Sequence, residues 1–156
     1  MDLKQLYQDI ILEHGKSPRN FGKCKKYTHE AKGYNPLCGD KVQVYLKMNN
    51  KKEVENLTFE GSGCAISMAS TSIMTELVKG KSFDTAKKIV LDFFNMVKNT
   101  EEIKSEDLSE DEKTIIMSLS GVKQYPMRVK CATLAWHTLE SAIEDKKEEV
   151  NTEAVD

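Results

Sequence analysis

The chain has 156 residues, of which 39% are hydrophobic and 31% are charged, and its formal net charge is −2. This composition excludes collagen-like, repeat and disordered chains, and the near-neutral charge provides no basic surface for nucleic acid. The apolar runs are too short to cross a membrane and the N-terminus lacks a signal-peptide pattern, so we expect a cytoplasmic protein without membrane or nucleic-acid partners. We expect one domain over residues 1–145 and a polar, frayed C-terminal tail over residues 146–156.

The sequence contains four cysteines. Because the cytoplasm keeps thiols reduced, these residues indicate metal binding or thiol chemistry rather than disulfides. No two of them form a C-x-x-C pair, which argues against a zinc ribbon or a thioredoxin-type site.

The N-terminal segment predicts one helix followed by a long loop. Asp2 has the position of a helix cap, and apolar residues then recur at helical intervals as far as Gly15. Residues 16–37 are rich in Pro and Gly and predict a loop with one strand near residues 27–31. Cys24 lies among lysines in this loop without a partner motif, so we expect an exposed or half-buried residue with no role in a site.

The motif NPLCGD forces a turn in which a single glycine separates Cys38 from Asp40. Alternating apolar residues then predict a strand over residues 41–47, and a second strand follows over residues 54–60. If these strands pair antiparallel, the start of the first lies beside the end of the second. We therefore expect the Cys38 turn and the loop that carries Cys64 to be neighbours at one end of the sheet.

The segment GSGCAISMASTSIMTELVK places Cys64 directly before a helix that Gly80 is suited to end. Taken alone, a cysteine here is a small core residue. The unpaired N–H groups and the dipole of a helix start also favour a thiolate over a thiol, however. Cys64 is therefore a candidate ligand or nucleophile.

The second half of the chain predicts three further helices. One begins at Ser82, a short one begins at the capping box of Ser109 and Glu112, and the last is introduced by Pro126. The acidic segment between the first two, residues 99–113, predicts a solvated connector.

The last helix carries Cys131 in its first turns, the same electrostatic position as that of Cys64. Arg128 precedes Cys131 by three residues, so the two can share a helix face. The apolar stripe of this helix leaves His137 on the opposite face, where we expect it to be solvated.

Cys38, Asp40, Cys64 and Cys131 together supply three thiolates and one carboxylate. Such a sulfur-rich, four-coordinate set suits Zn²⁺ or iron–sulfur chemistry. Beside three sulfurs the oxygen is the weaker donor, so we expect Asp40 to be the most exchangeable ligand unless an incoming partner displaces a thiolate.

The motifs NPLCGD, GSGCAISMAS and RVKCATLAW resemble the three cysteine motifs of the U-type iron–sulfur assembly proteins, the IscU/SufU family related to the NifU N-terminal domain. LYQDIILEHGKSPRN resembles the first helix and loop of that family. The predicted elements indicate a small α+β domain, and the resemblance implies a SufE/NifU-like fold with a largely antiparallel three-stranded sheet, helices packed on one face and a metal site at one end. It also implies that Cys38, Asp40, Cys64 and Cys131 are the ligands of the metal or cluster.

Two departures from IscU resemble the SufU branch. Lys130 stands where IscU has a histidine, and the segment around residues 99–123 is longer. The SufU branch holds a tightly bound zinc ion and is paired with a SufS-type cysteine desulfurase. The resemblance therefore implies both for this chain, with Arg128 matching an arginine of that branch and the acidic connector as a candidate docking segment.

These features lead to the hypothesis of zinc-dependent sulfur transfer in iron–sulfur cluster assembly. In this sulfurtransferase-like role Cys38 would accept persulfide sulfur from the desulfurase, with support from Arg128, for a downstream cluster scaffold or apo iron–sulfur proteins. A scaffold that assembles a transient [2Fe–2S] cluster from iron on the same four residues is the alternative. A third hypothesis is a zinc-stabilised adaptor that only activates the desulfurase.

Overall fold

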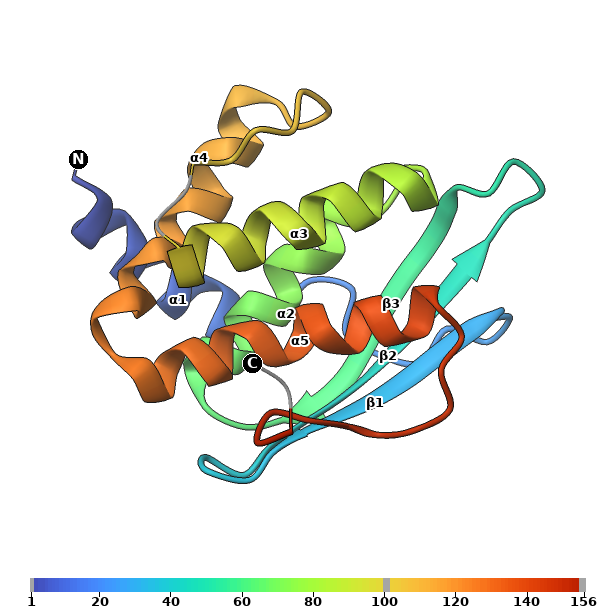
Figure 1. Ribbon diagram of the computed structural model, residues 1–156, viewed down its shortest axis with the longest axis horizontal. Helices are drawn as coiled ribbons and strands as arrows, with labels where there is room; N and C mark the ends of the chain where they lie inside the picture. Colours follow the sequence, from blue (N-terminus) through green and yellow to red (C-terminus); the bar gives the residue numbers. More distant parts are fainter. Residues whose placement is uncertain (1, 100–101, 155–156) are drawn as a thin grey trace.

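The computed structural model describes residues 2–99 and 102–154, which form a four-stranded sheet, five α-helices and one 3-10 helix. In chain order the elements are α1 (Leu3–Lys16), β1 (His29–Asn35), β2 (Asp40–Met48), β3 (Val54–Ser62), α2 (Ala65–Val78), α3 (Phe83–Asn99), α4 (Glu110–Ser118), η1 (Leu119–Gln124), α5 (Pro126–Ile143) and β4 (Val150–Asn151). Helices α2 and α5 pack on the sheet, while α1 packs on α2 and α3 packs on α5 (Figure 1). The predicted α+β fold with helices on one face is confirmed. Within the described residues, no helix has the length and hydrophobicity of a membrane-crossing segment.

The sheet has the strand order β3-β2-β1-β4. Strand β2 pairs antiparallel with both β1 and β3, and Lys41 at the start of β2 lies opposite Ser62 at the end of β3. The predicted hairpin is therefore confirmed. Its geometry brings the turn of Cys38 and the loop before Cys64 to the same end of the sheet.

The sheet has one strand more than predicted, and the strand expected near residues 27–31 covers His29–Asn35. The additional strand, Val150–Asn151, pairs parallel with β1. The expectation of a frayed C-terminal tail is wrong for this segment. A parallel pairing of two residues with a strand far away in the chain leaves no alternation that the local sequence could reveal.

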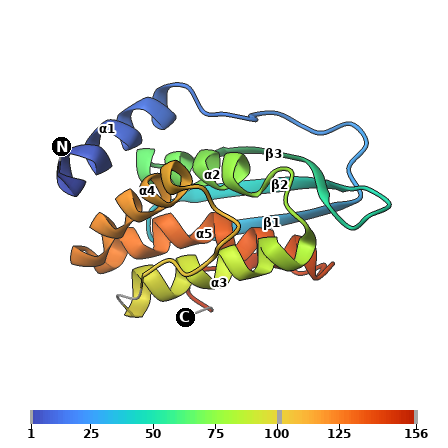
Figure 2. The same cartoon turned by 90° about the horizontal axis from the view of Figure 1, so that it is seen from above.

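Main-chain hydrogen bonds from irregular segments cover the outer edge of β3. The connection between α1 and β1 runs beside β3 in Figure 2, where Gly22 N donates to Phe59 O (2.7 Å) and Phe59 N donates to Asn20 O (3.1 Å). At the other end of β3, Gly80 N donates to Val54 O (2.8 Å). On the opposite edge of the sheet, β4 pairs with β1.

Trp136 of α5 is completely buried and connects three elements of the core. Its ring stacks on Phe93 of α3 with the centroids 4.2 Å apart, and its Nε1 donates to Ser70 Oγ of α2 (3.0 Å). A buried indole N–H that lacked such an acceptor would carry a desolvation cost of about 1–3 kcal/mol. The apolar stripe predicted for α5 is therefore the face that fixes this helix against α2 and α3.

His137 is half-buried, so the expectation that it is solvated is wrong. Its ring stacks on Phe94 of α3 with the centroids 4.2 Å apart. Burial and the nearby charge of Lys98 lower the pKa of His137 to about 4. Since α3 also covers this side of α5, the helix is enclosed on more faces than its apolar stripe indicates.

The acidic connector, residues 99–113, is anchored to the core at two points. Ile103 and Leu108 are 8% and 4% exposed and belong to the main hydrophobic cluster. Positions 100 and 101 lie outside the described residues. For Ile103 and Leu108 the prediction of a solvated connector is wrong, because isolated apolar residues in a charged segment carry no periodicity.

Candidate metal centre

Asp40 is the first residue of β2 and lies at the centre of the candidate site. It is opposite Asn35 in the β1–β2 pairing and is completely buried. Its Oδ2 accepts a hydrogen bond from Asn35 Nδ2 (3.0 Å), and its Oδ1 accepts one from the main-chain N–H of Cys64 (2.8 Å). These bonds offset the cost of burying a carboxylate and fix the position of both oxygens.

Cys64 is the N-cap of α2, so its predicted position at a helix start is confirmed. Its Sγ accepts a hydrogen bond from Ser67 N (3.4 Å) and lies 4.0 Å from Asp40 Oδ2. Hydrogen bonding with Cys131 lowers the pKa of the Cys64 thiol to about 7, against the opposing effect of burial. Cys64 therefore becomes a thiolate readily near neutral pH.

Cys131 lies in α5 and is buried, whereas Cys38 lies in the β1–β2 turn and is exposed. Their Sγ atoms are only 3.2 Å apart. Hydrogen bonding to Cys64 and burial both raise the pKa of Cys131. In the metal-free cluster Cys131 therefore keeps its proton, which a metal ion would have to displace.

One candidate ligand atom from each of Cys38, Asp40 and Cys131 lies within 4.8 Å of the other two, so this group could hold a metal ion. Cys64 reaches the same group through its 4.0 Å approach to Asp40. The four residues singled out from the sequence are thus brought together. Three sulfurs and one carboxylate oxygen are donors that Zn²⁺ accepts in a tetrahedral site, and thiolates also suit iron–sulfur clusters.

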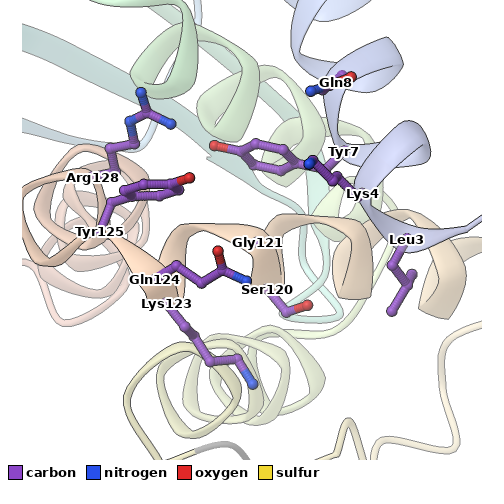
Figure 3. A pocket seen from close by; sticks show the side chains of 10 residues that line it. All are labelled: Leu3, Lys4, Tyr7, Gln8, Ser120, Gly121, Lys123, Gln124, Tyr125 and Arg128. Atoms are coloured by element: carbon purple, nitrogen blue, oxygen red, sulfur yellow. The ribbon is translucent and has the colours of Figure 1, made fainter.

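Arg128 lies outside this cluster, on the wall of a cavity of about 490 Å³. Figure 3 shows it above Tyr125, with the hydroxyl of Tyr7 pointing toward it. The guanidinium carbon is 4.3 Å from the centroid of the Tyr125 ring. Lys4 and Lys123 also line the cavity, and none of its lining residues is acidic. The cavity is therefore suited to an anionic group of a binding partner.

The hydrogen bonds of Asp40 come from Asn35 and Cys64, and within the described part of the chain none joins Asp40 to Arg128. A role for Arg128 in orienting Asp40 therefore has no contact to support it. A role toward a partner fits its exposed position.

Cys24 is buried, with 7% of its surface exposed, so the expectation of an exposed or half-buried residue is wrong. Its Sγ lies 3.6 Å from Asn56 Nδ2 of β3. The loop that carries Cys24 packs along the edge of β3 instead of extending into solvent. Cys24 is not part of the group that could hold a metal.

Two residues of the site were missed by the sequence analysis. Asn35 Nδ2 lies 3.5 Å from Cys131 Sγ in addition to its bond to Asp40, and Asn35 Oδ1 accepts from Thr152 Oγ1 (2.9 Å). In the sequence, Asn35 precedes a proline and indicates only a turn. Thr152 lies in a polar tail that contains no motif, so nothing local could have identified it.

The sequence model of the NifU-like N-terminal domain matches residues 6–153. This chain belongs to that family. The resemblance to SufU and IscU is thereby confirmed over nearly the whole chain.

Individual relatives of this NifU-like domain carry two kinds of name. The zinc-dependent sulfurtransferase SufU of Bacillus subtilis (strain 168) is 40% identical over 142 residues, which cover 91% of this chain and 92% of that protein. The iron–sulfur cluster assembly scaffold protein IscU of Streptococcus pyogenes serotype M1 is 37% identical over 141 residues, 90% of this chain and 84% of that protein. The crystal structure of FiSufU, assigned to the SUF system of Fervidobacterium islandicum AW-1, is similar with a TM-score of 0.78 and 34% identity, over 89% of this chain and 97% of that one.

Lys130 of this NifU-like domain occupies the position directly before the third motif cysteine. Its Nζ forms an ion pair with Glu153 Oε1 of the C-terminal segment (2.9 Å). A protonated amine has no lone pair to offer a metal ion. At this position the chain therefore has a link from α5 to its C-terminal segment in place of a potential metal donor.

Proposed function

We propose that this NifU-like domain is a zinc-dependent sulfur acceptor and carrier for iron–sulfur cluster assembly, supplied by a SufS-type cysteine desulfurase in the cytoplasm. The observation that carries the proposal is the exposure of Cys38, because the other three candidate ligands are less accessible. Asp40 and Cys131 are buried and Cys64 is half-buried, so an approaching protein reaches Cys38 first. The likeness to a SufU named as a zinc-dependent sulfurtransferase supports the same function.

Cys38, Asp40, Cys64 and Cys131 would hold the zinc ion. When bound, zinc keeps its thiol ligands deprotonated and contributes no redox chemistry of its own. As the only oxygen donor beside three sulfurs, Asp40 is expected to be the most exchangeable ligand unless a partner displaces a thiolate. The complete burial of Asp40 and its two hydrogen bonds favour that second case, with Cys38 as the ligand that leaves.

The transfer step needs no external oxidant or reductant. The Cys38 thiolate attacks the terminal sulfur of a persulfide on the desulfurase cysteine. A new S–S bond forms at Cys38, the S–S bond of the desulfurase breaks, and the desulfurase cysteine leaves as a thiolate. The proton on the terminal sulfur stays with that sulfur, so the product is a Cys38 persulfide for a downstream scaffold or apo iron–sulfur protein.

Exposed apolar side chains beside two ligand-bearing elements support docking of the desulfurase at this end of the molecule. Leu37, which precedes Cys38, is 49% exposed, and Tyr125 and Met127 near the start of α5 are 46% and 56% exposed. Aromatic residues, Met and Arg are enriched in protein interfaces. Together with Arg128, these exposed side chains lie on the turn that carries Cys38 and at the start of the helix that carries Cys131.

Persulfide formation on the purified protein tests this function. The protein is incubated with a SufS-type desulfurase and L-cysteine, alkylated, and analysed by peptide mass spectrometry. Cys38→Ser should abolish the persulfide, whereas the matched variant Cys24→Ser should carry as much persulfide as the wild type. Undiminished persulfide in Cys38→Ser, or a zinc-loaded but inactive Cys24→Ser protein, would overturn the assignment.

A cluster scaffold is the second candidate, favoured by the relatives named as IscU scaffold proteins. Metal and acid-labile sulfide are measured before and after exposure to iron, desulfurase and L-cysteine. About one zinc per chain with little sulfide supports transfer. Iron and sulfide in matching amounts, in place of zinc, would support the scaffold. If Cys38→Ala still activates the desulfurase, the adaptor hypothesis is supported instead.

A further inference from the structure

The side chain of Asn35 links the candidate metal ligands to the C-terminal segment. It is completely buried at the end of β1. Its Nδ2 lies 3.0 Å from Asp40 Oδ2 and 3.5 Å from Cys131 Sγ, so one amide group contacts two of the candidate ligands. Its Oδ1 accepts the hydrogen bond of Thr152 Oγ1 at 2.9 Å.

The chemistry of these partners allows only one orientation of the amide. The Oδ2 of Asp40 accepts the hydrogen bond, so the NH₂ group of Asn35 faces it. The amide oxygen then points away from the ligands and requires a donor in a buried position. Thr152 supplies that donor and is itself only 2% exposed.

Thr152 is held in place by the segment around it. Strand β4 pairs parallel with β1, and Thr152 N donates to Tyr34 O at 3.1 Å. One residue later, Glu153 forms the ion pair with Lys130 of α5. The segment is thus tied both to the strand that carries Asn35 and to the helix that carries Cys131.

We propose that Asn35 and Thr152 act together as positioning residues for the metal site, with Thr152 fixing the Asn35 amide and that amide orienting Asp40 and Cys131. This inference rests on the proposed metal ligands and assigns a role to the first residue of the NPLCGD motif and to a residue outside the three cysteine motifs. The N–H group also withdraws electron density from the sulfur that it approaches. The Cys131 sulfur is therefore the weaker nucleophile, whereas Cys38 Sγ, whose contact among the described residues is with Cys131 Sγ and not with an N–H group, serves as the acceptor.

Removal of the Thr152 hydroxyl tests the pair without touching a ligand. Thr152→Val keeps the shape of the side chain but leaves the Asn35 oxygen without its donor. Loss of a group that orients a metal ligand reduces metal affinity by about 10- to 100-fold. We expect this reduction for Zn²⁺ in competition with a chromogenic chelator, and a changed sulfur-to-metal charge-transfer spectrum when Co²⁺ replaces Zn²⁺.

Two further variants separate positioning from a general loss of stability. Thr152→Ser keeps the hydroxyl and should restore both the zinc affinity and the cobalt spectrum. Glu153→Gln removes only the neighbouring ion pair and should leave the cobalt spectrum unchanged. A Thr152→Ser protein as impaired as Thr152→Val would show that the hydroxyl is not the cause.

The double variant Asn35→Ala/Thr152→Val tests whether Thr152 acts through Asn35. If it does, the double variant loses no more zinc affinity than Asn35→Ala alone, because the effects of residues in one chain of contacts are not additive. Losses that add in full, or a Thr152→Val protein with wild-type affinity and spectrum, overturn the inference. A wild-type protein that binds neither zinc nor cobalt overturns the proposed metal site instead, so the two failures are distinguishable.

Discussion

The sulfur atoms of Cys38 and Cys131 lie 3.2 Å apart although the two residues are 93 positions apart in the sequence. A disulfide bond is about 2.05 Å long, so a movement of about 1 Å would bring these sulfurs to bonding distance. The same proximity that makes the pair suitable for a shared metal ion exposes it to oxidation when no metal is bound.

We predict that the metal-free protein forms a Cys38–Cys131 disulfide under mild oxidation by diamide, which takes up the two electrons and two protons. Bound zinc should slow this reaction by about 10-fold or more, because coordinated thiolates are occupied. Peptide mass spectrometry after alkylation measures the product. Cys24→Ser should behave like the wild type, and a dominant disulfide that includes Cys24 would contradict the prediction.

Arg128→Ala should weaken use of the protein as a sulfur acceptor without reducing its zinc content. Arg128 is exposed beside Tyr125 and has no hydrogen bond to Asp40 among the described residues, so we expect its partner on the desulfurase. An interface arginine commonly contributes enough for the half-saturating acceptor concentration to rise by about 10-fold. Steady-state desulfurase assays measure this change. Lys147→Ala, a remote exposed cation, is the control, and zinc loss in Arg128→Ala would place the residue with the metal ligands instead.

Gly63→Ala should weaken metal binding because Gly63 packs against a ligand. Its φ is +155°, and an added Cβ would lie 3.0 Å from Asp40 Cα and would contact the Asp40 carboxylate. Displacement of Asp40 should reduce zinc affinity by about 10-fold or more. Gly22→Ala is a matched control, since Gly22 also has a positive φ (+130°) but no atom within 4 Å of an added Cβ. Equal zinc affinities in the two variants would exclude the proposed displacement.

His137 should make the free energy of unfolding depend on pH. Its folded-state pKa of about 4 lies below the ordinary value of about 6.5, so the unfolded chain binds the proton more readily. The contribution is therefore fully present above about pH 6.5 and is lost as the pH falls toward 4. In urea titrations over this pH range, the free energy of unfolding of the wild type should fall by roughly 1–3 kcal/mol more than that of His137→Phe. Parallel pH profiles of the two proteins would contradict the assignment.

The sequence was sufficient for the parts of the fold that repeat locally. The hairpin of β2 and β3 follows from alternation, and the start of α4 follows from the capping box of Ser109 and Glu112, in which both hydrogen bonds are present. From that hairpin alone, Cys38 and Cys64 could be expected at one end of the sheet. These features depend on neighbours in the chain, which is why they can be recognised without a structure.

Features that depend on distant partners could not be predicted in this way. Thr152 belongs to a polar segment whose position depends on a two-residue pairing with β1. The burial of Cys24 depends on the edge of β3, and that of His137 depends on the path of α3. In each case the sequence correctly shows a polar or isolated residue. It does not show which distant segment packs against that residue.

The covered edges of the sheet limit how a partner can be recruited. Many peptide-binding domains add a strand of their partner to an open sheet edge. Here the main-chain groups of Phe59 and Val54 are already bonded to the Gly22 and Gly80 segments, and β4 pairs with Gly33 and Tyr34 near the end of β1. These contacts favour recognition of a desulfurase through side chains at the end of the sheet that carries Cys38. They also make it harder for the covered parts of β3 and β1 to pair with another copy of the chain.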